Sequence, residues 1–539
     1  MNHPPTSVDR SRTPYRLAYR DQVPKKSETA TPQDLIDLVR TGYACQGPAL
    51  ELGALVIDGK AVPEAGVRIP LRAMNRHGLV AGATGTGKTK TLQLMAEQLS
   101  AAGVPVFVAD MKGDLSGIAV PGQPNDKITA RATEVGQPWT PAAGPVEFYS
   151  LGGKGTGVPI RATITSFGPI LLAKVLDLGD VQASSLGLVF HFADKAGLPL
   201  LDLKDLRAVI TYLTSDDGKA SLAELGGLSK ATAGVILREL VTFADSGADI
   251  FFGEPEFDTT ELLRTSPDGH GIVSCLELPD VATQPRLFST FLMWLLADLY
   301  EALPEAGDLD KPKLCFFFDE AHLLFADAST DFLEQITQTV RLIRSKGVGV
   351  FFVTQSPTDV PAEVLAQLGS RVQHALRAFT PQDAKALKAT ASTYPESPFY
   401  EMTELLTSVG TGEAVVTVLD EKGVPTPVAW TRLRAPQSLM APCPPAQMQA
   451  AVAASPLQPK YGQAIDRESA YEKLAAKLAP AHAAPTAEVP APSAPQARQQ
   501  GLGVAQKVLG SPAFTSFLRS AGTVIGREIT RSLFGTRRR

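Results

Sequence analysis

Apolar and polar residues follow a regular order through the middle of the chain. A short apolar run at 79–81 is followed by a segment with helical spacing of its apolar residues, 89–102, and by a second apolar run, 104–109. Short apolar runs predict buried strands, and recurrence at three and four residues predicts a helix. Further apolar runs lie at 271–276, 314–318, 349–354 and 372–379. Strands that alternate with helices predict an α/β fold with a mostly parallel sheet covered on both faces.

The same pattern divides the chain into parts. Leu and Ala recur at helical intervals between 170 and 250, which predicts a helical insertion between two parts of the core, 78–169 and 251–435. Short alternating segments predict a small β element at 46–77. The apolar runs 414–419 and 428–430, with Gly423 between them, predict a closing hairpin. The polar residues 1–45 predict a flexible N-terminal segment.

The C-terminal part of the chain changes composition. Residues 436–500 are rich in Pro and Ala, which predicts a linker that carries a short helix near 467–478. In residues 501–539 apolar residues recur at helical spacing, and there are seven Lys or Arg and one Glu. This predicts a basic amphipathic helix. Its apolar stripe would need a surface: the protein's own core, a partner's groove, or an anionic membrane or DNA.

Composition narrows the class of protein only slightly. The net charge of −5 gives no argument for nucleic acid, so any such contact must come from local basic patches or a central pore. None of the four cysteines forms a CxxC pair, so we expect reduced thiols and no zinc site. The N-terminus has no apolar stretch typical of a signal peptide, and no apolar run is long enough to span a bilayer. We therefore expect a cytoplasmic protein without membrane insertion.

The sequence following the first strand fits G-x-x-x-x-G-K-[ST] and opens a helix, which is the context this phosphate-binding motif requires. Backbone N–H groups close around phosphates in such a loop, and the helix N-terminus favours their charge. Lys88 would contact the β- and γ-phosphates, and the Thr89 hydroxyl would bind Mg²⁺. The nucleotide-binding residues predicted here are Gly82, Ala83, Thr84, Gly85, Thr86, Gly87, Lys88 and Thr89.

The apolar run 314–318 ends in Asp319 and Glu320. An apolar strand that ends in an acid, paired with a phosphate-binding loop, predicts a second ATPase motif. Asp319 would hold Mg²⁺, directly or through water, and Glu320 would polarise the water that attacks the γ-phosphate.

Two further strand-end positions are candidates for the same site. Gln355 follows the run 349–354, at the end of a strand where ligands bind in open α/β sheets, and is a candidate sensor of the γ-phosphate. The alternative is a polar cap of the next turn. Asp110 follows the run 104–109 and could orient Glu320 or the water around the metal. Its alternative is a turn-forming Asp before Gly113.

Arg341 and Arg344 lie three residues apart before the run 349–354, so they share a helix face. A guanidinium that stabilises transition-state charge is a recurring part of phosphoryl transfer, often supplied by a neighbouring subunit. The alternative is an exposed basic helix end. Arg371 and Arg377 are weaker candidates.

These motifs carry a family resemblance. The runs 75–89, 316–325 and 341–357 resemble the HerA-like branch of the HerA/FtsK P-loop ATPases, and most closely the bacterial YjgR-type HerA-like helicase family. The resemblance covers roughly residues 40–435, and the run 525–535 is also similar to that group. It implies a RecA-like core, ATP and Mg²⁺ as ligands, a homohexameric ring, and translocation on double-stranded DNA.

The resemblance also assigns roles by position. It implies that Lys88, Thr89, Asp319, Glu320 and Gln355 perform the roles given above, and that Arg344 acts across the subunit boundary. HerA-type proteins usually carry a β-barrel before the P-loop that docks a nuclease partner, whereas 81 residues precede Gly82 here. The short segment argues against docking through a full barrel, and a nuclease is a possible partner only by the resemblance. The same fold also serves ATPases that act on protein, so an ATP-gated assembly or regulatory ATPase is the alternative.

Overall fold

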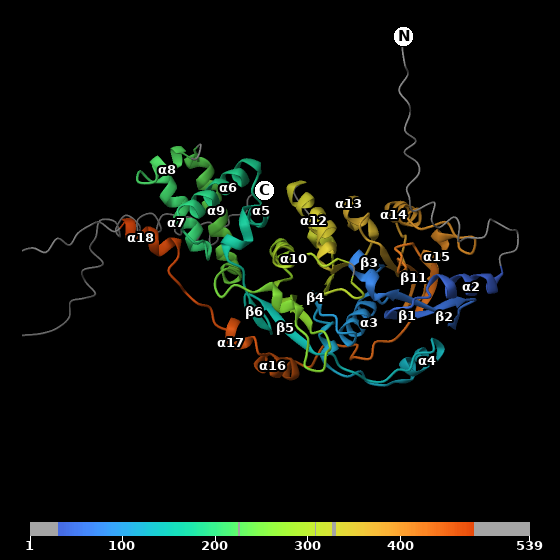
Figure 1. Ribbon diagram of the computed structural model, residues 1–539. Coiled ribbons are helices and arrows are strands. Elements are labelled where there is room, and N and C mark those ends of the chain that lie inside the picture. The colour runs from blue at the N-terminus through green and yellow to red at the C-terminus, as the bar shows by residue number, and fades with distance from the viewer. Residues whose placement is uncertain (1–30, 225–226, 308, 326–329, 479–539) are drawn as a thin grey trace, which may run out of the picture. The chain divides into compact units, whose positions relative to one another are not determined.

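The structure is a computed structural model that describes residues 31–224, 227–307, 309–325 and 330–478 (Figure 1). Its framework is one 12-stranded sheet in the order β2-β1-β12-β11-β10-β3-β9-β8-β4-β7-β5-β6, counted over those residues. The strands are β1 (Ala49–Ile57), β2 (Lys60–Pro70), β3 (Gly78–Ala81), β4 (Val106–Asp110), β5 (Val146–Leu151), β6 (Val158–Ile160), β7 (Val273–Glu277), β8 (Leu314–Phe318), β9 (Val348–Thr354), β10 (Ser370–Gln373), β11 (Glu413–Thr417) and β12 (Ala429–Leu433).

The sheet has a parallel part and an antiparallel part. The strands from β10 to β6 in this order pair in parallel, while β11, β12, β1 and β2 continue the sheet by antiparallel pairing. The mostly parallel α/β prediction is therefore confirmed. The element expected at 46–77 is the antiparallel edge formed by β1 and β2. Strands β5 and β6 were not predicted from the sequence.

Helices cover both faces of the sheet, as the alternation within each strand requires. Val106 and Val108 of β4 point to the face covered by α3 (Lys88–Ala101), and pack with its buried residues Leu92, Met95 and Leu99. Phe107 and Ala109 point to the opposite face, where the long apolar helix α10 (Pro285–Ala302) lies. A parallel sheet buried on both faces explains why its strands are apolar throughout.

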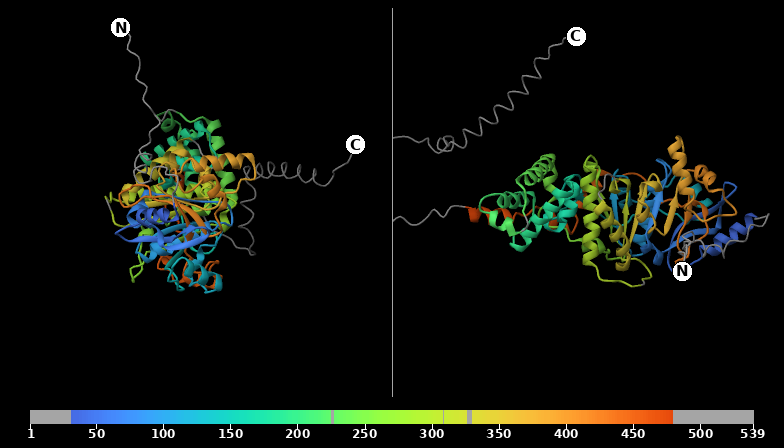
Figure 2. Two further views of the ribbon diagram at one scale, coloured as in Figure 1. Left: turned by 90° about the vertical axis from the view of Figure 1, so that its right-hand side faces the viewer. Right: turned by 90° about the horizontal axis from the view of Figure 1, so that it is seen from above.

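The segment expected to be helical contains five helices that pack against one another and reach the sheet through α10 (Figure 2). They are α5 (Ile164–Val175), α6 (Asp180–Lys195), α7 (Leu203–Thr214), α8 (Lys219–Glu224) and α9 (Lys230–Phe243). The remaining helices are α2 (Pro32–Gly42), α4 (Asp126–Glu134), α11 (His322–Phe325), α12 (Thr330–Ile343), α13 (Ala362–Leu365), α14 (Pro381–Ala391), α15 (Met402–Ser408), α16 (Pro445–Ala453), α17 (Gln458–Tyr461) and α18 (Ala470–Leu478). No helix in the described ranges is both long and apolar enough to cross a membrane.

The prediction of a flexible segment at 1–45 was wrong for residues 31–45. Helix α2 begins at a capping box in which the Thr31 side chain accepts from Asp34 N. Its C-terminal end is fixed to the sheet, because the hydroxyl of the buried C-cap residue Tyr43 lies 2.8 Å from the carbonyl oxygens of both Val416 and Pro427 and shares its single hydrogen between them. Because the segment is mostly polar, its sequence pattern did not reveal the few apolar residues that pack this helix against the core.

The prediction of a linker at 436–500 was wrong for residues 436–469, whereas the short helix expected near 467–478 is present as α18. Residues 436–478 run along the core and carry α16, α17 and α18. Tyr461 is fully buried, and its carbonyl oxygen accepts a hydrogen bond from Arg161. The Glu97 carboxylate on α3 accepts bonds from Gln437 N and Ser438 N. Pro and Ala content predicted extended chain, but scattered large side chains anchor it. Residues 1–30 and 479–539, which include the predicted basic tail 501–539, lie outside the described residues.

Candidate functional site

The predicted nucleotide residues converge at one edge of the sheet because of strand order. Strands β3, β9, β8 and β4 are neighbours and parallel, so their carboxyl ends meet at the same edge. The P-loop, residues 82–89, follows β3, Gln355 follows β9, and Asp319 and Glu320 follow β8. Strand β9 separates the P-loop strand from the strand that carries the two acids. A phosphate held by the P-loop would therefore face both the acids and Gln355.

The P-loop has a backbone that requires glycine. Gly82 has φ +153°, and a Cβ built there would lie 2.5 Å from Cβ of His374. Gly87, at φ +114°, is the N-cap residue of α3. The loop is tied to the sheet next to it, because Ala83 N donates to Ala375 O at 2.8 Å and Thr86 O accepts from Gly412 N at 3.0 Å. Close packing on β10 and β11 thus sets the loop conformation.

The Lys88 ammonium lies within this loop. Its Nζ donates to the carbonyl oxygens of Gly82 at 2.6 Å and Ala83 at 3.2 Å. Burial lowers the pKa of Lys88, the charges of Glu320 and Asp319 act in the opposite direction, and Lys112 lowers it further. The charge of Lys88 therefore interacts with the charges of both acids. Its hydrogen bonds go to backbone carbonyl oxygens, which the oxygens of a bound phosphate would replace as acceptors.

His374 packs against Gly82 of the P-loop. It follows β10, is fully buried, and its Nε2 lies 2.9 Å from the Thr91 hydroxyl on the first turn of α3. Burial, with a contribution from the Lys88 charge, lowers the pKa of His374 to about 4, so the ring is neutral at pH 7. A neutral imidazole fits beneath a loop that already holds one cation.

Asp319 presents one free carboxyl oxygen. Its Oδ1 accepts from Glu320 N at 2.9 Å, whereas Oδ2 is buried and makes no hydrogen bond to any residue that the structure describes. Burial and the neighbouring Glu320 raise the pKa of Asp319 to about 7. An enclosed carboxylate oxygen without a donor suits Mg²⁺ or its bound water, and the half-buried Thr89 at the start of α3 offers a hydroxyl on the facing loop. The residues present therefore fit the metal.

Glu320 lies in a turn with φ +48°, an uncommon conformation for a residue other than glycine. Its Oε1 accepts a hydrogen bond from Lys112 Nζ at 2.7 Å. Burial alone would raise the pKa of Glu320, but the bond and charge of Lys112, with smaller contributions from His322 and Gln355, lower it below its usual value. The side chain is consequently an anion at pH 7, as a group that polarises water must be.

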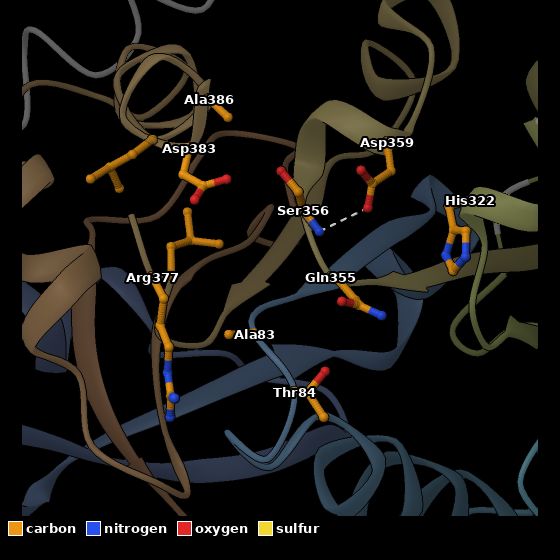
Figure 3. A pocket seen from close by; sticks show the side chains of 11 residues that line it. Ala83, Thr84, His322, Gln355, Ser356, Asp359, Arg377, Asp383 and Ala386 are labelled. Atoms are coloured by element: carbon orange, nitrogen blue, oxygen red, sulfur yellow. Dashed lines mark hydrogen bonds between the residues drawn. The ribbon is translucent and has the colours of Figure 1, made fainter. Parts of the chain in front are cut away.

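Gln355 lines an open cavity of about 440 Å³ beside the P-loop (Figure 3). The turn that presents it is fixed by Asp359, whose Oδ2 accepts from Thr354 Oγ1 at 2.6 Å and from Ser356 N at 2.9 Å. Figure 3 shows the Gln355 side chain between Thr84 of the P-loop and His322. Arg377 also lines this cavity. The other lining residues are Ala83, Leu376, Asp383, Ala386 and Leu387.

Asp110 is fully buried at the end of β4, and both of its carboxyl oxygens are occupied. Oδ1 accepts from Lys112 N at 3.1 Å and Gly113 N at 2.8 Å, and Oδ2 accepts from Leu115 N at 2.8 Å. This is the turn-forming alternative of the sequence analysis. Among the described residues, Asp110 makes no hydrogen bond with the P-loop, and it is connected to Glu320 only through the turn that carries Lys112.

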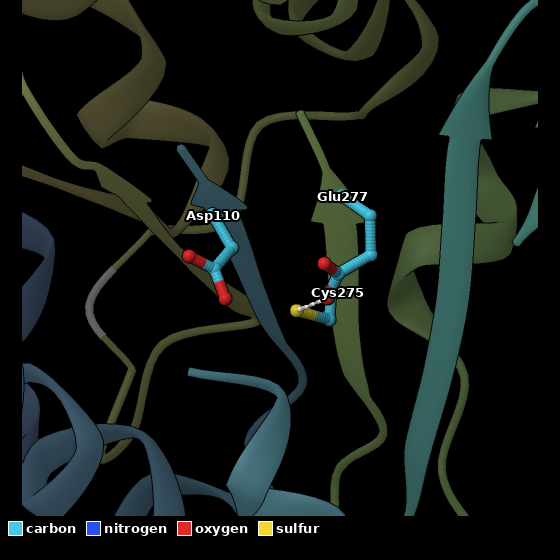
Figure 4. Close-up of side chains that lie close together, drawn as sticks. All are labelled: Asp110, Cys275 and Glu277. Carbon is cyan, nitrogen blue, oxygen red and sulfur yellow. Dashed lines mark hydrogen bonds between the residues drawn. The ribbon is translucent and has the colours of Figure 1, made fainter. Parts of the chain in front are cut away.

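Asp110 also lies close to two side chains of β7, Cys275 and Glu277 (Figure 4). The Cys275 thiol donates to Glu277 Oε1 at 3.3 Å. Burial, followed by the Asp110 charge, raises the pKa of Glu277 to about 8, so this carboxyl is largely protonated at pH 7. All four cysteines of the chain are free thiols, as expected.

The two candidate arginines lie near the amino ends of the parallel strands, on the side opposite to the carboxyl ends that carry the nucleotide site. Arg341 lies in the last turn of α12, Arg344 begins the turn Arg344–Lys346 just before β9, and both are exposed. Strand β9 has 7 residues, so at about 3.3 Å per residue its two ends are about 20 Å apart. Gln355 and the P-loop are at the far end. Neither arginine therefore reaches the nucleotide site of its own chain. Arg371 stacks on Tyr394 instead.

Sequence reasoning missed two residues of this site, Lys112 and His374. Lys112 follows Asp110 by two positions, so it stands at the same carboxyl edge as the predicted acids, and that position was the available signal. His374 belongs to no motif in the sequence, and its place next to Gly82 depends on the pairing of β10 with β3.

The fold and the site define a RecA-like P-loop NTPase. The family model described as "Helicase HerA-like C-terminal" matches residues 57–539, and the chain belongs to this family. Among solved structures, the plasmid coupling protein TrwB in complex with a non-hydrolysable ATP analogue is similar, at 19% identity and a TM-score of 0.50, over 75% of this chain and 98% of that chain. VirB4 of Thermoanaerobacter pseudethanolicus aligns at 14% identity and a TM-score of 0.47, over 75% and 99%. The likeness to TrwB concerns the fold alone. No curated protein matches the sequence.

Proposed function

We propose that this protein is a Mg²⁺-dependent ATPase that works as a ring-forming motor on double-stranded DNA. The observation that carries the ATPase is the convergence of the P-loop, Asp319, Glu320 and Gln355 on the adjacent parallel strands β3, β9 and β8. Family membership supports the motor. The arrangement of the site supports ATP hydrolysis. The choice of double-stranded DNA as the polymer that the motor moves rests on the family alone.

In hydrolysis, Lys88 exchanges its bonds to the Gly82 and Ala83 carbonyls for the β- and γ-phosphate oxygens, and the loop N–H groups bind the same charge. Glu320 accepts a proton from the attacking water while the oxygen of that water forms a bond to the γ-phosphorus. The bond from that phosphorus to the β,γ-bridging oxygen breaks, and ADP leaves with the electron pair. Gln355 contacts the γ-phosphate and reports its loss through the turn that Asp359 fixes.

Thr89 and Asp319 are the proposed ligands of Mg²⁺. The unbonded Oδ2 of Asp319 is the observation that favours it. Bound Mg²⁺ supplies charge neutralisation on the phosphate oxygens. TrwB, whose fold is similar, has been solved with an ATP analogue, which agrees with a nucleotide at the P-loop of this chain.

The ring is proposed as a homohexamer in which one subunit completes the site of the next. Arg341 and Arg344 are exposed and about one strand length from their own P-loop, so a role in catalysis requires a neighbour. Head-to-tail assembly, which closes into a ring, brings one edge of a subunit against a different surface of the next. A cytoplasmic location remains an expectation, in agreement with four free thiols. A nuclease partner remains an expectation of the family resemblance.

Duplex DNA tests the substrate. We expect it to raise the ATPase rate of the full chain, and we expect that stimulation to fall steeply as salt is raised, because phosphate contacts release counterions. Negative-stain images with ATP and DNA should show rings with DNA in the centre. If duplex DNA does not stimulate the ATPase at any salt concentration, the proposal of ATP hydrolysis still stands, but the better assignment becomes an ATPase that acts on protein.

A further inference from the structure

A lysine outside the known motifs holds the Glu320 carboxylate. Lys112, in the turn after β4, places its Nζ 2.7 Å from Glu320 Oε1. The Glu320 side chain is 13% exposed and that of Lys112 is 53% exposed, so the ammonium reaches an enclosed carboxylate from its open side. An ion pair with one shielded partner is stronger and more directional than one on the open surface.

The two oxygens of Glu320 have different surroundings. Oε1 is bound by Lys112, whereas Oε2 is buried and accepts no hydrogen bond of normal length from the described part of the chain, although the Gln355 amide lies close enough to Glu320 to favour its charged form. His322 Nδ1 lies 3.4 Å from Oε2, too long for a strong bond. The Glu320 backbone is held as well, since Glu320 N donates to Asp319 Oδ1 and Ala321 N donates to Val353 O. One oxygen is therefore anchored and the other can accept a proton.

The position of Lys112 is set by Asp110. The buried Asp110 carboxylate accepts three backbone N–H groups of the turn, including that of Lys112 itself. The turn is closed further by Ser116, whose hydroxyl donates to Gly113 O and accepts from Cys443 N. A turn held by so many bonds cannot move the Lys112 Cα without losing several of them.

We propose that Lys112 is a positioning residue for ATP hydrolysis: by binding Oε1 of Glu320 it directs Oε2 to the attacking water, and Asp110 fixes the turn that carries it. This inference rests on the proposed ATPase function. In this role Lys112 acts on the attacking water only through Glu320. Asp110 thus contributes to the site without contacting nucleotide.

The first experiment measures steady-state ATPase kinetics of the full chain. Lys112→Met removes the ammonium and keeps the length of the side chain. We expect kcat to fall about 10- to 100-fold, part of the roughly 10²- to 10⁴-fold that a complete general base contributes, with KM for ATP changed less than about threefold. Lys112→Arg should restore most of kcat, because a guanidinium also donates to Oε1. Lys311→Met, which removes an exposed lysine bound to Ala102 O and Gly103 O, should leave kcat unchanged.

The second experiment asks whether Lys112 acts through Glu320. Single-turnover rates are measured for Glu320→Gln, Lys112→Met and the double variant. If Lys112 positions Glu320, adding Lys112→Met to Glu320→Gln should lower the rate by less than about twofold, since coupled residues are not additive. An equal loss in both backgrounds would mean that Lys112 contacts the phosphates directly, and would overturn the proposal.

Other results separate this inference from the ATPase itself. If Lys112→Met keeps the wild-type kcat while Glu320→Gln is inactive, the ATPase stands and the positioning role fails. If wild type and Lys88→Ala are equally inactive, the proposed function fails. Thermal unfolding and binding of a fluorescent ATP analogue check each fold. Should Lys112→Met be unfolded, Lys112→Gln replaces it, and an unchanged kcat in that folded variant refutes the role.

Discussion

The Lys88 ammonium donates a hydrogen bond to the Gly82 carbonyl oxygen at 2.6 Å, within the same loop. Both residues belong to the P-loop, so the ammonium that would bind phosphate is here hydrogen-bonded to the backbone of its own loop. Its replacement by phosphate exchanges a neutral acceptor for a charged one, and charge-assisted bonds are roughly twice as strong. The lysine is therefore the first residue whose removal should be measured.

We expect Lys88→Ala to abolish ATP hydrolysis and to weaken ATP binding about 10-fold or more, because a charge-assisted hydrogen bond contributes about 1.5–3 kcal/mol. Steady-state ATPase rates and titration with a fluorescent ATP analogue measure the two effects. Lys127→Ala, on the exposed face of α4, is the matched control. Wild-type binding and turnover in the Lys88→Ala variant would show that this loop does not hold the nucleotide.

Glu320→Gln should keep ATP binding and lose turnover by about 10²- to 10⁴-fold, because the amide can occupy the same place but cannot accept the proton from water. Binding titrations and single-turnover hydrolysis separate the two steps. A Glu320→Gln variant with normal turnover would remove this residue from the mechanism.

Mixing experiments decide whether an arginine acts between subunits. Arg344 lies at the amino end of β9 and Gln355 at its carboxyl end, so Arg344 cannot complete its own site. Arg344→Ala and Lys88→Ala subunits should each be inactive alone, and their mixture should regain part of the activity because some interfaces then contain both residues. Mixtures no better than either variant, while wild-type subunits diluted into them keep full activity per site, would exclude Arg344. The same design applies to Arg341.

The stability of the fold should fall as pH rises towards 8 because of Glu277. Its pKa is raised from about 4.5 in the unfolded chain to about 8 in the fold, mainly by burial and then by Asp110. Since the folded state retains the proton, this contribution is complete below pH 4.5 and is lost as pH rises through 8. Urea unfolding midpoints at pH 5.5 and 8.5 should differ less for Glu277→Gln than for wild type.

The exposed Glu301→Gln is the control for that comparison and should keep the wild-type pH difference. An identical pH dependence for Glu277→Gln would mean that Glu277 is ionised in the folded protein. The comparison uses the change between the two pH values, since losing the Cys275 bond alters the stability at both.

Deletion of residues 501–539 should leave the basal ATPase nearly intact, because the residues of the site, of which Leu387 in the cavity wall is the last, all lie well before residue 501. The basic amphipathic pattern of this segment predicts that the deletion impairs oligomerisation or stimulation by DNA. Size-exclusion chromatography with light scattering and DNA-stimulated ATPase assays measure both. If both match the full chain, the segment serves neither the ring nor DNA, and an external partner becomes the better explanation.

Residues that act through local sequence were predictable. The P-loop from Gly82 to Thr89 and the acids Asp319 and Glu320 each depend on a short run next to an apolar strand, and an apolar strand is visible in sequence because both faces of a parallel sheet are buried. The run 314–318 has the same bounds as β8. The sequence therefore determined the core fold, the order of its strands and helices along the chain, and where the nucleotide motifs lie on them.

Tertiary structure alone decided which groups face one another. The contact between Lys112 and Glu320 joins β4 to β8, and the place of His374 under Gly82 follows from the pairing of β10 with β3. By its sequence Asp110 could orient Glu320 or close a turn, and the folded turn decides this, because three of its backbone N–H groups donate to the Asp110 carboxylate. The separation of Arg344 from the P-loop likewise follows from strand direction. A local pattern fixes what each residue can do, but its partner depends on pairings between segments hundreds of residues apart, which periodicity does not encode.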